Sequence, residues 1–128
     1  GESDEGAVWE AMLSAAKHRL DRFTLLIDHN KLQSWGRVAD ILPLAPYADK
    51  WRAFGAGVAE VDGHDPDALE TTLRALPVEP GKPSVVILHT VKGRGIPLLE
   101  NNPAWHHKTK LGGEDYLSLL EALEGAAS

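Results

Sequence analysis

The chain has 128 residues, 43% of them hydrophobic and 25% charged, which is typical of a globular domain that can bury a core of its own. Its formal charge of −6 disfavours binding to nucleic acid or to an anionic membrane, because both would repel the protein. The absence of cysteine excludes disulfides, a thiolate nucleophile and sulfur-ligated metals, and no apolar run approaches the roughly 18 residues of a membrane span.

The first half of the chain alternates helical and strand patterns. Between residues 5 and 20, apolar side chains recur at spacings of three and four, which predicts an amphipathic helix. These apolar positions are Val8, Met12, Ala15, Ala16 and Leu20. The apolar run 23–27 is too short for a helix and predicts a strand covered on both faces. Residues 34–43 are expected to be irregular with one helical turn, and a short helix over 46–54 should stop at Gly55.

The next pair of elements has clearer boundaries. A second short strand is predicted over 58–61. It leads to Asp65, which suits a helix N-cap, and to Pro66, which suits the first helical position. We expect the helix that follows to turn three leucines toward a core, namely Leu69, Leu73 and Leu76.

A third strand and a last helix complete the pattern. Residues 84–88 predict another buried strand, and a long connection over 96–112 follows it. The last helix is expected over 113–123, with three leucines facing inward. These are Leu117, Leu120 and Leu123.

The alternation of helices and strands predicts an α/β fold, a parallel sheet with flanking helices. In such sheets, ligands bind beyond the carboxyl ends of the strands. Two segments rich in polar and histidine residues, 28–33 and 89–107, each follow a predicted strand. The sequence therefore predicts a functional site built from these two segments.

Six segments, taken together, resemble a transketolase. They are residues 1–11, 28–33, 61–65, 82–84, 89–95 and 100–106, which follow one another in the family's order. The first is similar to the stretch that begins at the last glycine of the family's Gly-Asp-Gly motif, and the second to the distal end of the same diphosphate-binding motif. The Asn-Asn-Pro-Ala-Trp-His run in the last segment resembles the bacterial type whose two halves are separate chains.

This resemblance implies a domain organisation that extends beyond the chain. Residues 1–128 would form the C-terminal part of a thiamine-diphosphate-binding domain, a part of that α/β fold. The upstream half of that domain and the pyrimidine-binding domain would lie outside the chain. An aspartate that holds Mg²⁺ would directly precede Gly1.

The resemblance further implies two cofactors, thiamine diphosphate and Mg²⁺ or another divalent cation. Such a cation needs hard oxygen ligands, and the resemblance assigns them to the Asn30 side chain and the Leu32 backbone carbonyl. From the residues alone, Asn30 is instead interpreted as a residue that holds a turn. Gly1 and Glu2 would begin a helix whose amide groups face the diphosphate, whereas their sequence alone describes an acidic, flexible terminus.

Two histidines are implied to lie at the cofactor. His106, after Asn-Pro-Ala-Trp, is implied to be catalytic and to donate to a diphosphate oxygen or a sugar hydroxyl, and His89 is implied to contact the cofactor at a strand end. The alternative for each is ordinary loop packing. His107 departs from the family, which more often has glycine there. Residues 92–95 are short enough to be either a phosphate-binding nest or a tight solvated turn, and the turn is the favoured interpretation.

Three functions follow as hypotheses. The first is part of a transketolase that transfers a two-carbon ketol unit from a ketose to an aldose phosphate. Its partners would be a pyrimidine-binding subunit, in a homodimer or heterotetramer, and sugar phosphates, and its location cytoplasmic. The second is another thiamine diphosphate enzyme, a deoxyxylulose-phosphate synthase or a 2-oxo acid dehydrogenase component. The third is a non-catalytic assembly half that is inactive by itself.

Overall fold

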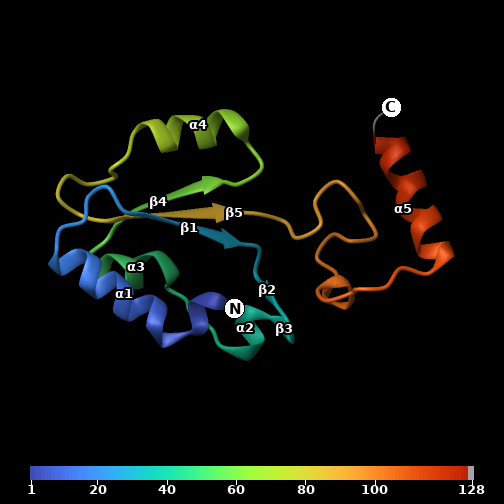
Figure 1. The fold of residues 1–128 in the computed structure, drawn as a ribbon, viewed down its shortest axis with the longest axis horizontal. Coiled ribbons are helices and arrows are strands. Elements are labelled where there is room, and N and C mark those ends of the chain that lie inside the picture. Colours follow the sequence, from blue (N-terminus) through green and yellow to red (C-terminus); the bar gives the residue numbers. More distant parts are fainter. Residues whose placement is uncertain (127–128) are drawn as a thin grey trace.

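The computed structural model describes residues 1–126, which form a three-stranded parallel sheet with helices on both faces (Figure 1). The strands are β1 (Thr24–His29), β4 (Gly57–Asp62) and β5 (Ser84–His89), and β5 lies between the other two. In the strand pairing, His89 lies opposite His29 on one side and Asp62 on the other, at the carboxyl edge of the sheet. The predicted parallel α/β fold is confirmed.

Three helices cover the sheet. Helices α1 (Gly6–Lys17) and α3 (Tyr47–Ala53) lie on one face, and α4 (Pro66–Arg74) lies on the other (Figure 1). Each corresponds to a helix that the sequence predicts, with boundaries that differ by a few residues. This arrangement buries the sheet's middle strand and leaves its carboxyl edge open.

The main core lies between the sheet and the helices α1 and α3. Its buried members are Met12, Ile27, Trp51, Ala56, Val58, Val85 and Ile87. Trp51 is fully buried, and its ring stacks on that of Trp9 with the centroids 3.9 Å apart. This aromatic pair joins α3 to α1 and fixes the position of the segment that leads into α3.

The start of α4 has the predicted cap. The Asp65 carboxylate accepts hydrogen bonds from the backbone N–H groups of Asp67 and Ala68, both at 3.0 Å, and Pro66 occupies the first helical position. These contacts satisfy amide groups that have no partner inside the helix. The boundary could be predicted because it depends on side chains adjacent in sequence.

Several short elements follow β1 or precede α1. They are a 3₁₀ turn η1 (Glu2–Asp4), strands β2 (Leu32–Gln33) and β3 (Gly36–Arg37), and one helical turn α2 (Val38–Ile41). The helical turn is the one expected within residues 34–43, whereas the small β2–β3 hairpin is not predicted by the sequence. Strands of two residues carry no periodic pattern, so the sequence offers no signal for them.

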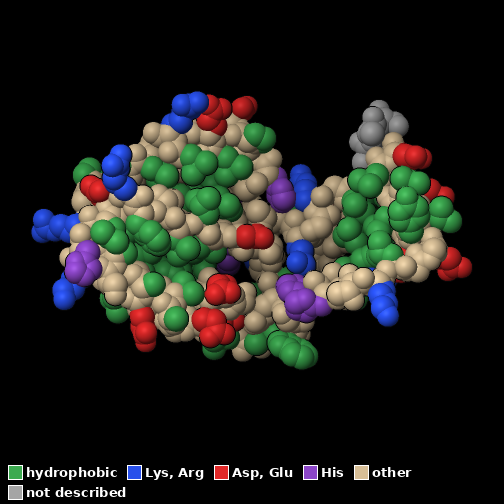
Figure 2. Space-filling model, viewed as in Figure 1, with side chains coloured by type: hydrophobic (Ala, Val, Ile, Leu, Met, Phe, Trp, Pro, Cys, Tyr) green, Lys and Arg blue, Asp and Glu red, His purple; other side chains and the backbone are tan. Residues whose placement is uncertain are grey.

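The last part of the chain lies beyond the carboxyl edge of the sheet. A short turn η2 (Pro103–Trp105) leads to helix α5 (Gly113–Ala126), which stands apart from the sheet (Figure 1). Figure 2 shows hydrophobic side chains gathered on this helix. The leucines predicted to face inward are exposed: Leu117 by 57%, Leu120 by 40% and Leu123 by 52%. That prediction is wrong for this chain, because periodicity identifies an apolar face but not what covers it.

Two further leucines differ from the prediction. Leu73 on α4 is 44% exposed, and Leu20 lies past the end of α1 with 47% exposed. Both sit near helix ends, where a side chain can reach past the edge of a small sheet. Within residues 1–126, the structure contains no helix with the length and apolarity needed to cross a membrane.

Candidate functional site

The end of β1 is tied to the residue that follows β5. The Asp28 carboxylate accepts a hydrogen bond from the Thr90 hydroxyl through one oxygen and from the Asn30 amide, at 3.1 Å, through the other. The Thr90 contact joins the ends of β1 and β5 at the carboxyl edge of the sheet, and the Asn30 contact orders the turn that follows β1. The sequence predicts a site formed by these two segments, and the structure brings them together there.

Asn30 forms a tight turn with Leu32. Its side-chain oxygen accepts a hydrogen bond from the Leu32 N–H at 2.9 Å, and Lys31 between them has a left-handed φ of 67°. The turn interpretation of Asn30 is therefore correct. It does not exclude the metal role, because an amide oxygen has two lone pairs and the turn uses one. The Leu32 side chain is itself buried.

Gly1 lies against the β2 strand. An added Cβ at Gly1 would come within 3.2 Å of the Gln33 side-chain oxygen, so a larger residue would crowd this contact. The Gln33 side-chain nitrogen is buried and has no partner among the described residues. It is a hydrogen-bond donor left available beside the amino terminus.

Gly1 and Glu2 do begin a helical turn, as predicted, but not α1 itself. Gly1 caps the 3₁₀ turn η1, in which the Asp4 N–H donates to the Gly1 carbonyl at 2.9 Å. Glu5 then adopts an extended conformation, and α1 starts at Gly6. The Glu2 side chain is exposed, and no contact of its carboxylate defines a role.

His106 reaches the same place from 72 residues further along the chain. Its Nε2 lies 3.5 Å from the Ser34 hydroxyl, and the Nε2 of His107 lies 3.0 Å from the same oxygen. The His106 Nδ1 is buried and has no partner among the described residues. The loop after β5 therefore folds back and brings His106 to the hairpin that follows β1.

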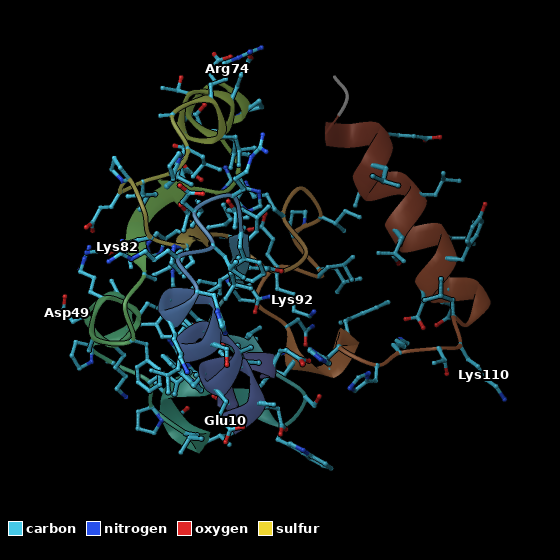
Figure 3. All side chains as sticks on the ribbon, turned by 60° about the vertical axis from the view of Figure 1, so that its left-hand side comes forward. Glu10, Asp49, Arg74, Lys82, Lys92 and Lys110 are labelled. Atoms are coloured by element: carbon cyan, nitrogen blue, oxygen red, sulfur yellow. The ribbon has the colours of Figure 1, made fainter. Side chains whose placement is uncertain are left out.

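The surroundings of His106 favour its neutral form. Burial lowers the pKa of His106 below its ordinary value of 6.5, and the positive charges of Lys92 and His107 lower it further. Figure 3 shows Lys92 between the sheet and the segment that carries α5. A neutral imidazole amid positive charge is suited to bind an anion by hydrogen bonding.

His89 belongs to a different cluster. Its Nε2 lies 2.8 Å from a Glu60 carboxylate oxygen, and its ring meets the edge of the His29 ring with centroids 5.5 Å apart. Its carboxylate partner Glu60 is thus on β4, and the structure does not bring His89 to His106. Sequence reasoning missed the Glu60 contact, although both residues lie on the α1–α3 side of neighbouring strands. That signal appears only once the strand register is known.

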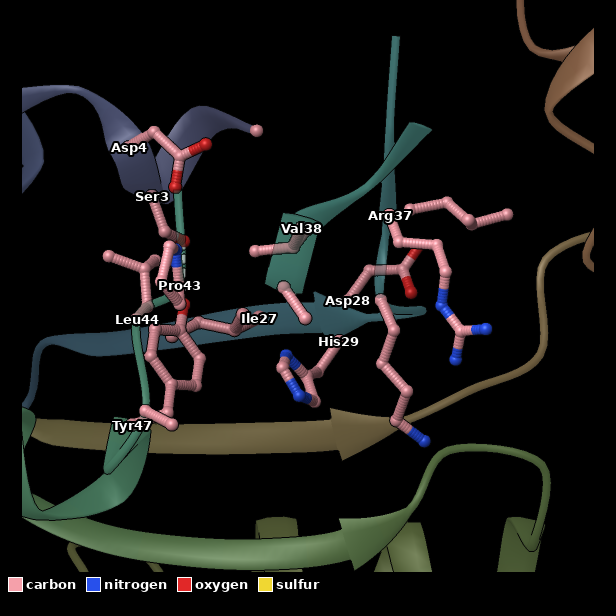
Figure 4. A pocket seen from close by; sticks show the side chains of 15 residues that line it. Ser3, Asp4, Ile27, Asp28, His29, Arg37, Val38, Pro43, Leu44 and Tyr47 are labelled. Carbon is pink, nitrogen blue, oxygen red and sulfur yellow. Dashed lines mark hydrogen bonds between the residues drawn. The ribbon is translucent and has the colours of Figure 1, made fainter. Parts of the chain in front are cut away.

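A cavity of about 280 Å³ lies between η1, the end of β1 and the segment before α3 (Figure 4). Gly1, Leu32 and His29 line it. On one side the Tyr47 hydroxyl donates to the Ser3 hydroxyl at 2.6 Å. Burial raises the pKa of Tyr47, so this hydroxyl stays protonated as a donor.

Two positively charged side chains line the cavity. Lys31 and Arg37 both contribute to its lining, and Figure 4 shows Arg37 near the Asp28 carboxylate. Together with Lys92 near His106, they give this end of an otherwise acidic chain a local positive character. Such a concentration favours an anionic ligand at the carboxyl edge.

Residues 92–95 form the tight turn that the sequence favours over a phosphate-binding nest. Gly93 has a φ of 77°, and an added Cβ would lie 2.6 Å from the Leu99 carbonyl oxygen. The Gly95 N–H donates to the Glu100 carboxylate at 3.0 Å, so the chain's own acid occupies it. We therefore assign no ligand to this turn.

The residues present fit a diphosphate bound with its cation, as one part of a larger site. Asn30 offers an oriented amide oxygen, and the unpartnered nitrogens of Gln33 and His106 can meet anionic oxygens. Within residues 1–126 no group of three or more His, Asp or Glu could hold a metal ion alone. A cation here would need further ligands from phosphate, water or another segment.

Known proteins resemble this chain over nearly its whole length. Residues 1–124 match the family model described as transketolase, thiamine diphosphate binding domain. The chain is 46% identical over 121 residues to an apulose-4-phosphate transketolase subunit of Actinobacillus succinogenes, covering 94% of this chain and 44% of that protein. It is 41% identical over 124 residues to the 6-deoxy-6-sulfo-D-fructose transketolase subunit SqwG of a Clostridium species, covering 97% and 45%.

A solved structure gives the same result. The transketolase of Campylobacter jejuni superposes with a TM-score of 0.82 and 26% identity, over 99% of this chain and 19% of that one. The chain thus spans less than half the length of the curated relatives and about a fifth of the solved transketolase. The resemblance inferred from the sequence is confirmed.

Proposed function

Since the chain belongs to the family of transketolase thiamine diphosphate-binding domains, we propose that it supplies part of the diphosphate site of a two-chain transketolase. The reaction would transfer a two-carbon ketol unit from a ketose to an aldose. The observation that carries the proposal is the convergence of Gly1, Asn30 and His106, from three distant segments, at one edge of the sheet.

Each residue has a role that its contacts support. The Asn30 amide oxygen and the Leu32 carbonyl would ligate Mg²⁺, with the Asn30 amide held in place by Asp28 and by the turn. The first turn at Gly1 and Glu2 would direct backbone N–H groups to the diphosphate.

His106 would donate a hydrogen bond to a diphosphate oxygen or a substrate hydroxyl, because its neutral form is favoured and its Nδ1 is unpartnered among the described residues. His89, held by Glu60, would contact the cofactor from the end of β5, the strand beside β1. When bound, thiamine diphosphate supplies the electron sink for carbon–carbon cleavage, while the protein positions it.

The assembly is part of the proposal. Three of the relatives are named as transketolase subunits, and this chain spans less than half of their length. A separate pyrimidine-binding subunit would therefore join it, together with the residues that complete its own half, as a homodimer or heterotetramer. The relatives' names include a sugar phosphate and a sulfonated sugar, so we propose anionic sugars, sugar phosphates first, as substrates. We also propose a cytoplasmic location, which fits a composition without cysteine.

Two observations favour a second function for the chain by itself. The exposed leucines of α5 and the incomplete cation site within residues 1–126 indicate a piece that needs its complement before it can work. In isolation the chain would then act as an assembly half with no cofactor affinity of its own.

Ketol transfer by the completed assembly tests the proposal. With Mg²⁺ and thiamine diphosphate, the assembly should transfer a two-carbon unit from a ketose phosphate to an aldose phosphate and should not consume pyruvate. Pyruvate consumption without ketol transfer would instead favour a deoxyxylulose-phosphate synthase or a 2-oxo acid dehydrogenase component.

A further inference from the structure

The Ser34 hydroxyl lies between two imidazole rings. Its oxygen is 3.0 Å from the His107 Nε2 and 3.5 Å from the His106 Nε2. The two rings meet edge to face, with centroids 4.5 Å apart and planes at 81°. One hydroxyl thus has two ring nitrogens within reach, and the nearer one belongs to His107.

A hydroxyl in this position can connect the two rings in sequence. It has one hydrogen to donate and two lone pairs to accept with. If the His107 Nε2–H donates to Ser34, the hydroxyl hydrogen is free to donate to the His106 Nε2. A neutral His106 that accepts at Nε2 must carry its own hydrogen on Nδ1.

The surroundings of the His106 Nδ1 favour a hydrogen on that nitrogen. The His106 Nδ1 is buried and has no partner among residues 1–126. Positive charge from Lys92 acts on the same ring. An anionic oxygen is the ligand that this charge favours, and it would be bound by an Nδ1–H but repelled by the lone pair of a bare Nδ1.

We propose that Ser34 and His107 form a hydrogen-bond relay that holds His106 as its Nδ1–H tautomer, with that hydrogen directed at an anionic ligand oxygen. Ser34 and His107 are positioning residues in this scheme, because neither needs to touch the ligand. The inference rests on the proposed function, which supplies the anion as the diphosphate of the cofactor.

The tautomer can be measured without any ligand. We would label the histidines of the 128-residue chain with ¹⁵N and record ring-nitrogen NMR shifts at a pH where the imidazoles are neutral. Wild-type His106 should have its hydrogen on Nδ1. In Ser34→Ala the ring loses the donor to Nε2 and should shift toward the Nε2–H form, which free neutral histidine prefers.

Matched variants separate the relay from a general disturbance. His107→Gly should shift the His106 tautomer as Ser34→Ala does, and His107→Gln, which keeps an N–H donor at similar reach, should restore it. Ser14→Ala, which changes an exposed residue on α1, should leave it unchanged. A wild-type Nε2–H tautomer, or a Ser34→Ala spectrum identical to wild type, would overturn the relay.

Cofactor binding gives a second readout in the completed assembly. Ser34→Ala should weaken Mg²⁺-dependent thiamine diphosphate binding by up to about tenfold relative to Ser14→Ala, the usual effect of one hydrogen bond. Equal affinities in the two variants would contradict the relay's link to the ligand. Absence of cofactor binding in the wild-type assembly would instead overturn the proposed function. The two failures can be told apart because the tautomer is measured without ligand.

Discussion

At the residue scale, Asn30 combines a structural and a chemical role. Its amide nitrogen donates to Asp28, and its oxygen accepts from the Leu32 N–H. The two bonds fix the plane of the amide, so its remaining lone pair has a defined direction. A ligand oriented before the metal arrives loses less conformational entropy on binding, which is why a turn residue is well suited to a cation site.

The substitution Asn30→Ala tests this role in the completed assembly. It removes the amide oxygen, and we expect Mg²⁺-dependent thiamine diphosphate binding to weaken by more than about 100-fold, beyond the usual effect of changing a residue outside the ligand set. Isothermal titration calorimetry with and without Mg²⁺ measures it. Asn101→Gly, at another left-handed position, is the control and should bind normally. An unchanged affinity in Asn30→Ala would remove Asn30 from the metal site.

At the element scale, the helix-to-sheet packing depends on one aromatic pair. Trp51 on α3 is fully buried against Trp9 on α1, and both cover the sheet. This contact holds α3 at the wall of the cavity that Tyr47 lines. The position of the cavity wall therefore depends on the buried Trp51–Trp9 contact, which lies outside the cavity itself.

We expect Trp51→Ala to lower the free energy of unfolding by about 3–5 kcal/mol, through lost burial and the cavity left behind. Trp35→Ala is a matched control, since Trp35 is 89% exposed and its loss should change stability by less than about 0.5 kcal/mol. Urea unfolding of both variants gives the comparison. Equal stability losses would mean that the core does not centre on Trp51.

The elements that could be predicted are those fixed by neighbours in sequence. Asp65 caps α4 through residues two and three positions later, and the three strands are short apolar runs bounded by polar residues. The β2–β3 hairpin and the environment of the α5 leucines could not be predicted correctly. The first has no periodicity, and the second depends on what covers an apolar face.

The candidate site likewise has parts that could be predicted from local sequence and parts that could not. Its two segments could be located from strand order, and the roles proposed for Asn30 and His106 came from the family resemblance. The Ser34 contact with His106 and the Glu60 contact with His89 span 72 and 29 residues. Contacts of that separation depend on how the loop after β5 folds back and on strand register, which no local pattern encodes.

At the scale of the whole molecule, the chain presents surfaces that its own described residues do not cover. The leucines of α5 are exposed, and Leu26 on β1 is exposed by 50% even though parallel strands are usually buried on both faces. Exposed apolar area of this kind is typical of an interface. It agrees with a chain that spans less than half of the transketolase subunits it matches.

Native mass spectrometry tests the central claim most directly. The chain would be combined with the segments that complete its own half of the enzyme and with a pyrimidine-binding subunit, in the presence of Mg²⁺ and thiamine diphosphate. We predict an assembly that contains this chain and one cofactor per site, and that loses the cofactor when Mg²⁺ is chelated. A chain that remains alone, or an assembly that forms without cofactor, would contradict the account.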